Sequence, residues 1–312
     1  MTKTDLFLFG AKQAVPIALG YIPVGTAYAV YAAQTGFAPW EIILISLTTY
    51  SGSGQFLVVS MTASGAALPI FAVALFLMNF RYFIMSTCVF SLFKKLSFLN
   101  RALFSHLVTD ETFAIFATSK KEIIGIPYFL GLFFTSWTAW VTGAVLGVIA
   151  NSFLSVALTQ ALGIALFALF IAIIVPAGRS DFKVGLMIFG TAVLNTVLYK
   201  FLSASESIVM SESNNHLLII LVAFLVTYPV RAIPALFLSK MKLSPYFQRF
   251  LDLVPFTAIT ALVFPGIFYC IENNDYAAYF GTAIAILCAL LKAPLSLNVV
   301  FTVVAVYLIL IF

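Results

Sequence analysis

Charged residues inside apolar stretches are the residues of this chain best placed to do chemistry. A charge held within lipid is costly, so it usually faces a partner, a water-filled cavity or a transported molecule. An arginine can hold a carboxylate through two parallel hydrogen bonds, and a carboxyl group in a low-dielectric site can carry a proton. Six residues of this kind interrupt apolar runs: Arg81, Asp110, Glu111, Arg231, Asp252 and Lys292.

Asp110 and Glu111 are the acid–base candidates. Neighbouring side chains on a helix diverge by about 100°, so one carboxylate could face a cavity while the other meets Arg81 or the backbone. His106 precedes Asp110 by four residues and would share its helical face. Lysines flank this polar stretch on both sides, so a solvated face at the cytoplasmic surface is the competing interpretation.

The segment Ser51-Gly52-Ser53-Gly54-Gln55 is the best candidate for binding a small molecule. Two glycines and two serines weaken a helix, and a broken helix exposes backbone N–H and C=O groups. A helix N-terminus created by such a break attracts an anionic group, and the hydroxyl and amide side chains add partners. Close helix packing through small residues is the alternative.

The first apolar segment contains Pro16, Gly20, Pro23 and Gly25, which we expect to interrupt it as well. Irregular backbone at membrane depth persists only where protein or a water-filled cavity covers it. Two interrupted neighbours therefore predict a cavity, with Pro23 and Gly25 forming the wall opposite the glycine–serine segment.

Asn79 and Arg81 stand two residues apart, so on an intact helix they point in nearly opposite directions. Both can face one site only if the helix is distorted there. Arg81 could hold a substrate carboxylate or could belong to a structural ion pair. Arg231 lies between Pro229 and Pro234, where we expect it to join two parts of the chain. Asp252 and Lys292 lie near segment ends and fit anchoring roles.

The composition requires helices in a membrane to position these residues. Of the 312 residues, 63% are hydrophobic and only 9% are charged, and the mean hydropathy is +1.12. The long apolar runs lack the alternation of barrel strands, so we predict an all-α, polytopic integral membrane protein with about nine to ten segments, some broken or re-entrant. The expected segments are about residues 13–35, 40–63, 67–91, 124–149, 156–177, 183–201, 217–238, 250–271, 276–292 and 295–312.

Several function classes are disfavoured by what the sequence lacks. Two histidines and three scattered cysteines give no metal-ligand spacing, and no Gly-rich loop with lysine suggests a nucleotide site. The basic residues cluster in short loops, which indicates topology rather than nucleic-acid binding. We expect no cofactor, no metal and no nucleic-acid partner.

The loop charges leave the start of the chain with two topologies. Loops near Arg179 and Lys240 read as cytoplasmic, and the loops at 150–156, 202–216 and 272–275 read as external. The basic pair at 94–95 fits this pattern only if the N-terminus is external or one early segment enters and returns. The second segment, 40–63, is the suspected re-entrant one.

A polar run at 203–216 divides the chain into a first domain, 1–202, and a four-segment second domain, 217–312. Short motifs in both parts resemble a known pair of membrane proteins. The first domain resembles AzlC, the large subunit of branched-chain amino acid exporters, and the second resembles AzlD, the small subunit. The motifs are Tyr21-Ile22-Pro23-Val24-Gly25, Ser51-Gly52-Ser53-Gly54-Gln55-Phe56, Asn79-Phe80-Arg81-Tyr82, Thr109-Asp110-Glu111-Thr112-Phe113, Thr227-Tyr228-Pro229-Val230-Arg231-Ala232-Ile233-Pro234 and Leu253-Val254-Pro255-Phe256.

The resemblance implies a fused secondary transporter, not an enzyme, that exports branched-chain amino acids across the cell membrane and is driven by an ion gradient. Taken with the residue patterns above, we expect substrate binding at Pro23, Gly25, Ser51–Gln55, Asn79 and Arg81, ion coupling at Asp110 and Glu111, and a domain contact at Arg231. The alternatives are a membrane-embedded enzyme or a channel that uses the Asp110 and Glu111 region. Membrane lipids and an amino acid are the expected partners, and a homo-oligomer stays open.

Overall fold

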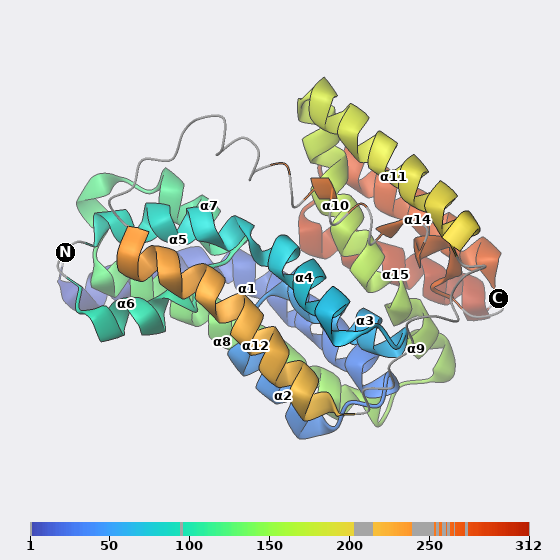
Figure 1. The fold of residues 1–312 in the computed structure, drawn as a ribbon, viewed down its shortest axis with the longest axis horizontal. Helices are drawn as coiled ribbons and strands as arrows, with labels where there is room; N and C mark the ends of the chain where they lie inside the picture. The colour runs from blue at the N-terminus through green and yellow to red at the C-terminus, as the bar shows by residue number, and fades with distance from the viewer. Residues whose placement is uncertain are drawn as a thin grey trace.

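The fold is described by a computed structural model that covers residues 2–93, 96–202, 215–238, 253, 256–257, 260, 263–264, 266–271 and 274–311. Every regular element in these ranges is helical, as the composition predicts (Figure 1). Most of the expected linker, ten of the 22 residues of the expected segment at 250–271, and Asp252 lie outside the described residues.

The helices follow one another with short connections. They are α1 (Lys3–Gln34), α2 (Pro39–Thr48), α3 (Gly52–Ala63), α4 (Leu68–Asn79), α5 (Arg81–Leu92), α6 (Phe98–Ser105), α7 (Asp110–Thr118), the 3₁₀ turn η1 (Lys121–Ile123), α8 (Ile126–Asn151), α9 (Val156–Gly163), α10 (Ala165–Ser180), α11 (Phe182–Leu202), α12 (His216–Ile233), the π-helical turn η3 (Pro234–Leu238), the 3₁₀ turn η4 (Gly266–Tyr269), α14 (Asp275–Leu290) and α15 (Leu295–Ile311).

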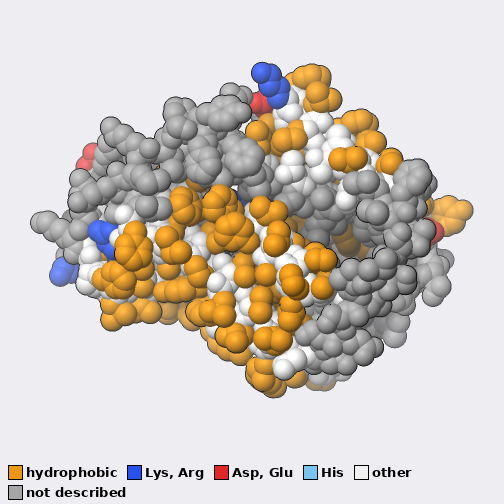
Figure 2. All heavy atoms as spheres, viewed as in Figure 1, with side chains coloured by type: hydrophobic (Ala, Val, Ile, Leu, Met, Phe, Trp, Pro, Cys, Tyr) orange, Lys and Arg blue, Asp and Glu red, His pale blue; other side chains and the backbone are white. Residues whose placement is uncertain are grey.

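Several of these helices suit a bilayer. Among the described residues, the stretches Lys3–Gln34, Ile126–Asn151, Gln160–Ser180 and His216–Phe237 are long and apolar enough to cross. The pair α4 and α5, bent by 43°, has the length and composition of a broken span or a re-entrant loop. Their outer faces are apolar: on α12, Leu217, Leu221 and Leu225 repeat every four residues and are each more than half exposed. Figure 2 shows hydrophobic side chains covering much of this face. The count of nine to ten segments stays a prediction.

The prediction that prolines and glycines interrupt the first segment is wrong. α1 runs unbroken over 32 residues with Pro16 and Pro23 inside it. Packing against α8 explains why: a Cβ at Gly25 would lie 2.9 Å from the Trp140 carbonyl oxygen, and one at Gly143 would lie 2.6 Å from that of Ile22. The missing side chains let two long helices touch along their backbones, and this packing offsets the hydrogen bonds that proline removes.

Three helices of the first domain are broken instead. α2 and α3 are separated at Thr49–Ser51, where Tyr50 has a φ of 37° in the left-handed region. α4 and α5 meet at Phe80 with a 43° bend. α6 and α7 are separated by residues 106–109. The first of these breaks meets the glycine–serine segment at Ser51, whereas Gly52–Gln55 form the first turn of α3. Whether 40–63 crosses or re-enters stays open.

The helices after α9 form two groups that pack in different parts of the molecule. α12 lies along α2, α4 and α5 of the first domain, whereas α10, α11, α14 and α15 pack together beside it (Figure 1). The three breaks therefore lie between α1, α12 and the α10 group, and this arrangement positions the site. The domain boundaries at 202 and 217 stay a prediction.

Candidate transport site

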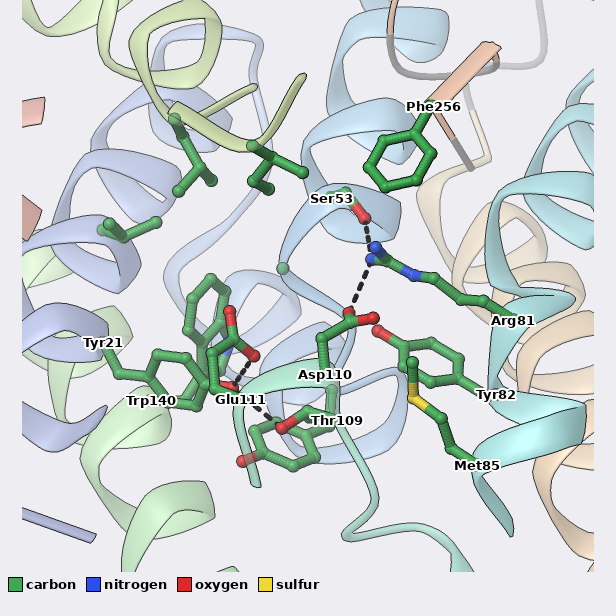
Figure 3. Close-up of a pocket in the computed structure, with 15 residues that line it drawn as sticks. Tyr21, Ser53, Arg81, Tyr82, Met85, Thr109, Asp110, Glu111, Trp140 and Phe256 are labelled. Atoms are coloured by element: carbon green, nitrogen blue, oxygen red, sulfur yellow. Dashed lines mark hydrogen bonds and ion pairs between the residues drawn. The ribbon is translucent and has the colours of Figure 1, made fainter. Parts of the chain in front are cut away.

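A cavity of about 410 Å³ opens beside the three helix breaks. Its walls come from helices α1, α3, α5, α7, α8 and α10, from the helix breaks, and from Phe256 (Figure 3). The residues that line it are Tyr21, Val24, Tyr50, Gly52, Ser53, Arg81, Tyr82, Met85, Thr109, Asp110, Glu111, Trp140, Leu169, Ile173 and Phe256.

The polar wall is built from the first turns of three helices. Gly52 and Ser53 begin α3, Arg81 begins α5, and Asp110 and Glu111 begin α7. The first N–H groups of a helix have no partner within it, and its N-terminus carries a partial positive charge. Each break thus brings polar backbone and side-chain groups to one cavity in an otherwise apolar protein.

Arg81 holds one carboxylate of this wall. Its Nη2 lies 3.0 Å from Asp110 Oδ2 and donates to the Ser53 hydroxyl at 2.8 Å (Figure 3). The side chains of Arg81 and Asp110 are 11% and 33% exposed, so the pair is open to the cavity rather than sealed. The sequence suggests that Arg81 either binds a substrate carboxylate or belongs to a structural ion pair. In the structure it forms an ion pair and also lines the cavity, so one guanidinium can do both.

Glu111 has a different environment. It accepts a hydrogen bond from the Tyr21 hydroxyl at 2.6 Å, and that hydroxyl also lies 2.9 Å from Thr109 Oγ1 (Figure 3). The ion pairs formed by the described residues are Arg81–Asp110 and His216–Glu41, and neither includes Glu111. The two adjacent carboxylates therefore face one cavity in unlike ways.

Tyr50 contributes a buried hydroxyl to the cavity. Its side chain is 1% exposed, and its Oη has no hydrogen bond of normal geometry to any of the described residues. A buried hydroxyl without a partner is unfavourable unless water or a ligand occupies the space beside it. The cavity is therefore suited to a polar occupant on this side.

Other residues of the lining are apolar. Val24 comes from α1, Leu169 and Ile173 come from α10, and Phe256 comes from the part of the chain between η3 and η4. In Figure 3, Phe256 lies above Ser53 and Arg81. The cavity thus joins a charged wall to a hydrocarbon wall.

Some predicted site residues lie behind this wall rather than on it. Ser51 donates to Asn79 Oδ1 at 2.6 Å and lies 3.2 Å from the Tyr82 hydroxyl. Gln55 donates to Ser46 at 3.1 Å and accepts from the Trp140 indole at 2.9 Å. These side chains are fully buried, and they fix the breaks from behind.

Two glycines and one proline that the sequence predicts at the site do not line the cavity. Gly54 packs against Ser51 and Asn79, and Gly25 packs against Trp140, so neither lines the cavity. Pro23 does not line it either. From α1 the wall consists of Tyr21 and Val24, because an unbroken helix turns those two positions inward.

His106 does not share a helical face with Asp110, as a continuous helix would require. It caps the C-terminus of α6, and Asp110 begins α7 after the break. Its Nε2 lies 2.8 Å from the carbonyl oxygen of Leu47. His106 therefore belongs to the packing between broken helices and does not line the cavity.

The sequence did not identify the aromatic and aliphatic residues that line the cavity. Tyr21 stands in the first quoted motif, which was a usable signal. Trp140, Leu169 and Ile173 stand in apolar helices, where a residue facing a cavity cannot be told from one facing lipid or a neighbouring helix.

Comparison with known proteins agrees with this architecture. The AzlC protein family matches residues 16–154, and the family of the branched-chain amino acid transport protein AzlD matches residues 216–310. The chain belongs to the AzlC–AzlD transporter family. All three helix breaks lie in the AzlC match, whereas α12, α14 and α15 lie in the AzlD match.

Individual relatives match a little more than half of this fused transporter. Inner membrane protein YgaZ of Escherichia coli is 33% identical over 179 residues, which is 55% of this chain and 73% of the relative. An uncharacterized membrane protein of Archaeoglobus fulgidus is 33% identical over 178 residues, covering 56% and 78%. One from Helicobacter pylori is 27% identical over 173 residues, covering 54% and 75%. No solved structure matches the chain.

These findings identify a multi-pass cell-membrane transporter rather than an enzyme. The AzlC–AzlD chain carries both parts of the family pair in one polypeptide. Its three broken helices and one amphiphilic cavity are the features a transport mechanism must use.

Proposed function

We propose that this AzlC–AzlD chain is a secondary transporter that exports branched-chain amino acids and is coupled to a proton gradient. The amphiphilic cavity carries this proposal. A branched-chain amino acid has a cation, an anion and a compact hydrocarbon side chain, and the cavity offers a match for each. Its volume of about 410 Å³ also suits a small solute, being near the low end for ligand pockets.

In the proposed binding mode, the substrate carboxylate lies by Arg81 and the first turn of α3. Arg81 supplies a charged donor, and Ser53 supplies a hydroxyl that Arg81 already contacts at 2.8 Å. The carboxylate would share the guanidinium with Asp110, because an arginine has five N–H donors in a planar fork.

The substrate ammonium lies by Glu111, and its hydrocarbon side chain lies against Val24, Leu169, Ile173 and Phe256. Burying that side chain contributes the hydrophobic part of the affinity, about 1.5–3 kcal/mol for full burial of a residue of this size. The polar groups orient the backbone of the substrate, and the apolar wall selects its side chain.

Glu111 is the proposed proton carrier, and Asp110 is not. Asp110 pairs with Arg81 at 3.0 Å, whereas Glu111 has a tyrosine hydroxyl as its hydrogen-bond partner. A carboxylate beside a cation gives up its charge less readily than one without. A proton on Glu111 would weaken its hold on the ammonium, and this links proton movement to substrate release.

Counterflow tests the transport proposal directly. Purified protein in vesicles preloaded with leucine should exchange external labelled leucine, with valine and isoleucine competing and glutamate not competing. Protein-free vesicles and vesicles preloaded with glutamate serve as controls. The absence of exchange with every branched-chain amino acid would contradict the proposed substrate class. A flux that never saturates and does not depend on internal leucine would indicate a channel instead.

Direction and coupling need a second measurement. Inside-out membrane vesicles should accumulate labelled leucine when an imposed pH gradient makes the interior acidic, because that orientation turns export into uptake. Accumulation that ignores the pH gradient would remove the proton from the proposal while leaving exchange intact.

A further inference from the structure

Arg231 of α12 is a buried cation that donates hydrogen bonds to the backbone at helix breaks in the AzlC half of the chain. It is 0% exposed, and among the described residues it has no carboxylate within ion-pairing distance. A charge buried without an anion is unfavourable unless several acceptors solvate it. Its acceptors here are backbone carbonyls at two of the breaks.

The first set of acceptors closes the α2–α3 break. Arg231 Nη1 donates to the Thr49 carbonyl at 2.9 Å, and Nη2 donates to the Tyr50 carbonyl at 2.6 Å. Thr49 caps the C-terminus of α2, where carbonyl groups lack helical partners and carry a partial negative charge. Tyr50 is the residue with positive φ that lines the cavity.

The second acceptor lies at the α6–α7 break. Arg231 Nη1 also donates to the His106 carbonyl at 3.3 Å, and His106 caps the C-terminus of α6. One guanidinium thus lies against the C-termini of two helices whose successors, α3 and α7, begin at the cavity. The planar fork of arginine allows this, since Nη1 and Nη2 carry several N–H donors that point at separate carbonyls.

The same face of α12 reaches the third break. Arg231 stacks over the ring of Tyr82 at 4.0 Å, in the first turn of α5. Thr227, one helical turn earlier, accepts a hydrogen bond from Asn79 Nδ2 at 2.9 Å, at the end of α4. All three breaks therefore contact one face of α12.

We infer that Arg231 is a positioning residue for the transport site: it holds the ends of α2 and α6 in place, so that α3, α5 and α7 begin at the cavity. The AzlD half thereby organises a site whose charged residues all belong to the AzlC half. The inference concerns the cavity that the proposed function uses, but the geometry of the breaks can be tested without any substrate.

Hydrogen exchange of the backbone amides gives that substrate-independent test. In purified Arg231→Met, the backbone amides of peptides that cover residues 50–55 and 107–113 should exchange at least about tenfold faster than in the wild type. The reason is that the carbonyls of Thr49, Tyr50 and His106, at the start of these two stretches, lose their donor. Peptides from α1 and α8 should be unchanged. Wild-type exchange at both breaks in a folded variant would overturn the inference.

Arg101→Met is a matched control. Arg101 also joins the two halves, through a hydrogen bond of 3.3 Å to the Ala235 carbonyl, and it donates at 3.1 Å to the Phe93 carbonyl of its own half. None of these three residues lines the cavity. Its loss should leave exchange at the three breaks unchanged. Equal acceleration at the breaks in both variants would show a general interface effect and would overturn a specific role for Arg231.

Binding and a conservative variant complete the experiment. Arg231→Lys keeps the charge but cannot reach separate acceptors as a fork, so it should show intermediate exchange and bind leucine about tenfold more weakly than the wild type. Full wild-type behaviour of Arg231→Lys would show that charge alone suffices and would contradict positioning. If Arg231→Met does not fold, Arg231→Lys carries the test alone. A wild type that binds no amino acid would defeat the proposed function, whereas the exchange comparison would still decide the inference.

Discussion

At the scale of single residues, the site depends on two carboxylates that are neighbours in sequence but differ in their partners. Asp110 pairs with Arg81, and Glu111 bonds to the Tyr21 hydroxyl. Because both begin α7, its N-terminal partial charge stabilises both anions in the same way. Their difference therefore comes from contacts with other helices.

Arg81→Lys should weaken leucine binding by about 10–100-fold, because an ammonium cannot serve Ser53, Asp110 and a substrate carboxylate as a planar fork can. Half-saturation of counterflow measures the change. Arg179→Lys is the control, since Arg179 is exposed and donates to the Leu290 carbonyl away from the cavity. Unaltered half-saturation in Arg81→Lys would exclude the proposed carboxylate site.

Glu111→Gln should abolish the leucine accumulation that a pH gradient drives in vesicles while leaving part of the leucine exchange. A glutamine keeps the hydrogen bond to Tyr21 but can neither gain nor lose a proton. Asp110→Asn is the comparison, and it should reduce binding through Arg81 rather than uncouple transport. Gradient-driven accumulation by Glu111→Gln would show that the proton is carried elsewhere.

At the scale of elements, unbroken and broken helices have separate tasks. α1 and α8 form a closely packed pair because glycines let their backbones touch. The pairs α2–α3, α4–α5 and α6–α7 break and expose polar helix ends. A motion that alternates access to the cavity would most readily bend at these three breaks, since the closely packed pair offers no such hinge.

Gly143→Ala should destabilise the protein by about 1–3 kcal/mol, because its Cβ would lie 2.6 Å from the Ile22 carbonyl oxygen and force α1 from α8. The thermal midpoint in detergent should fall accordingly. Gly190→Ala on α11 is the control, because no atom lies within 4 Å of the added Cβ. A midpoint for Gly143→Ala as high as that of Gly190→Ala would contradict the close approach of the two helices.

At the scale of the whole molecule, the cavity is shared between regions far apart in sequence. Its charges come from residues 81–111, whereas much of its apolar wall comes from α10 and Phe256. α12 meanwhile lies against all three broken pairs of helices. The AzlC and AzlD parts therefore form one functional unit in this fused chain.

Leu169→Ala should shift preference toward larger apolar amino acids, raising competition by phenylalanine relative to valine by about tenfold. The shortened side chain enlarges the hydrocarbon end of the cavity and leaves the charged wall intact. Competition against labelled leucine in counterflow measures the ratio. Leu186→Ala on α11, which is 61% exposed, should leave the ratio unchanged. An unchanged ratio in Leu169→Ala would place the substrate side chain elsewhere.

The sequence by itself determined the helical membrane class, the AzlC–AzlD resemblance and a helix break beside the segment Ser51–Gln55. These depend on composition and local backbone preference, which neighbouring residues largely decide. It also drew attention to Arg81, Asp110 and Glu111, because charges stand out in an apolar chain.

Only the tertiary structure decided that α1 stays whole despite its prolines, because packing against α8 outweighs local preference. The structure also decided that Gln55 and Asn79 lie behind the cavity wall while Leu169, Ile173 and Phe256 line it. In a membrane protein the side chains that face lipid, a neighbouring helix or a cavity are chemically alike, so only the three-dimensional arrangement of the helices distinguishes them.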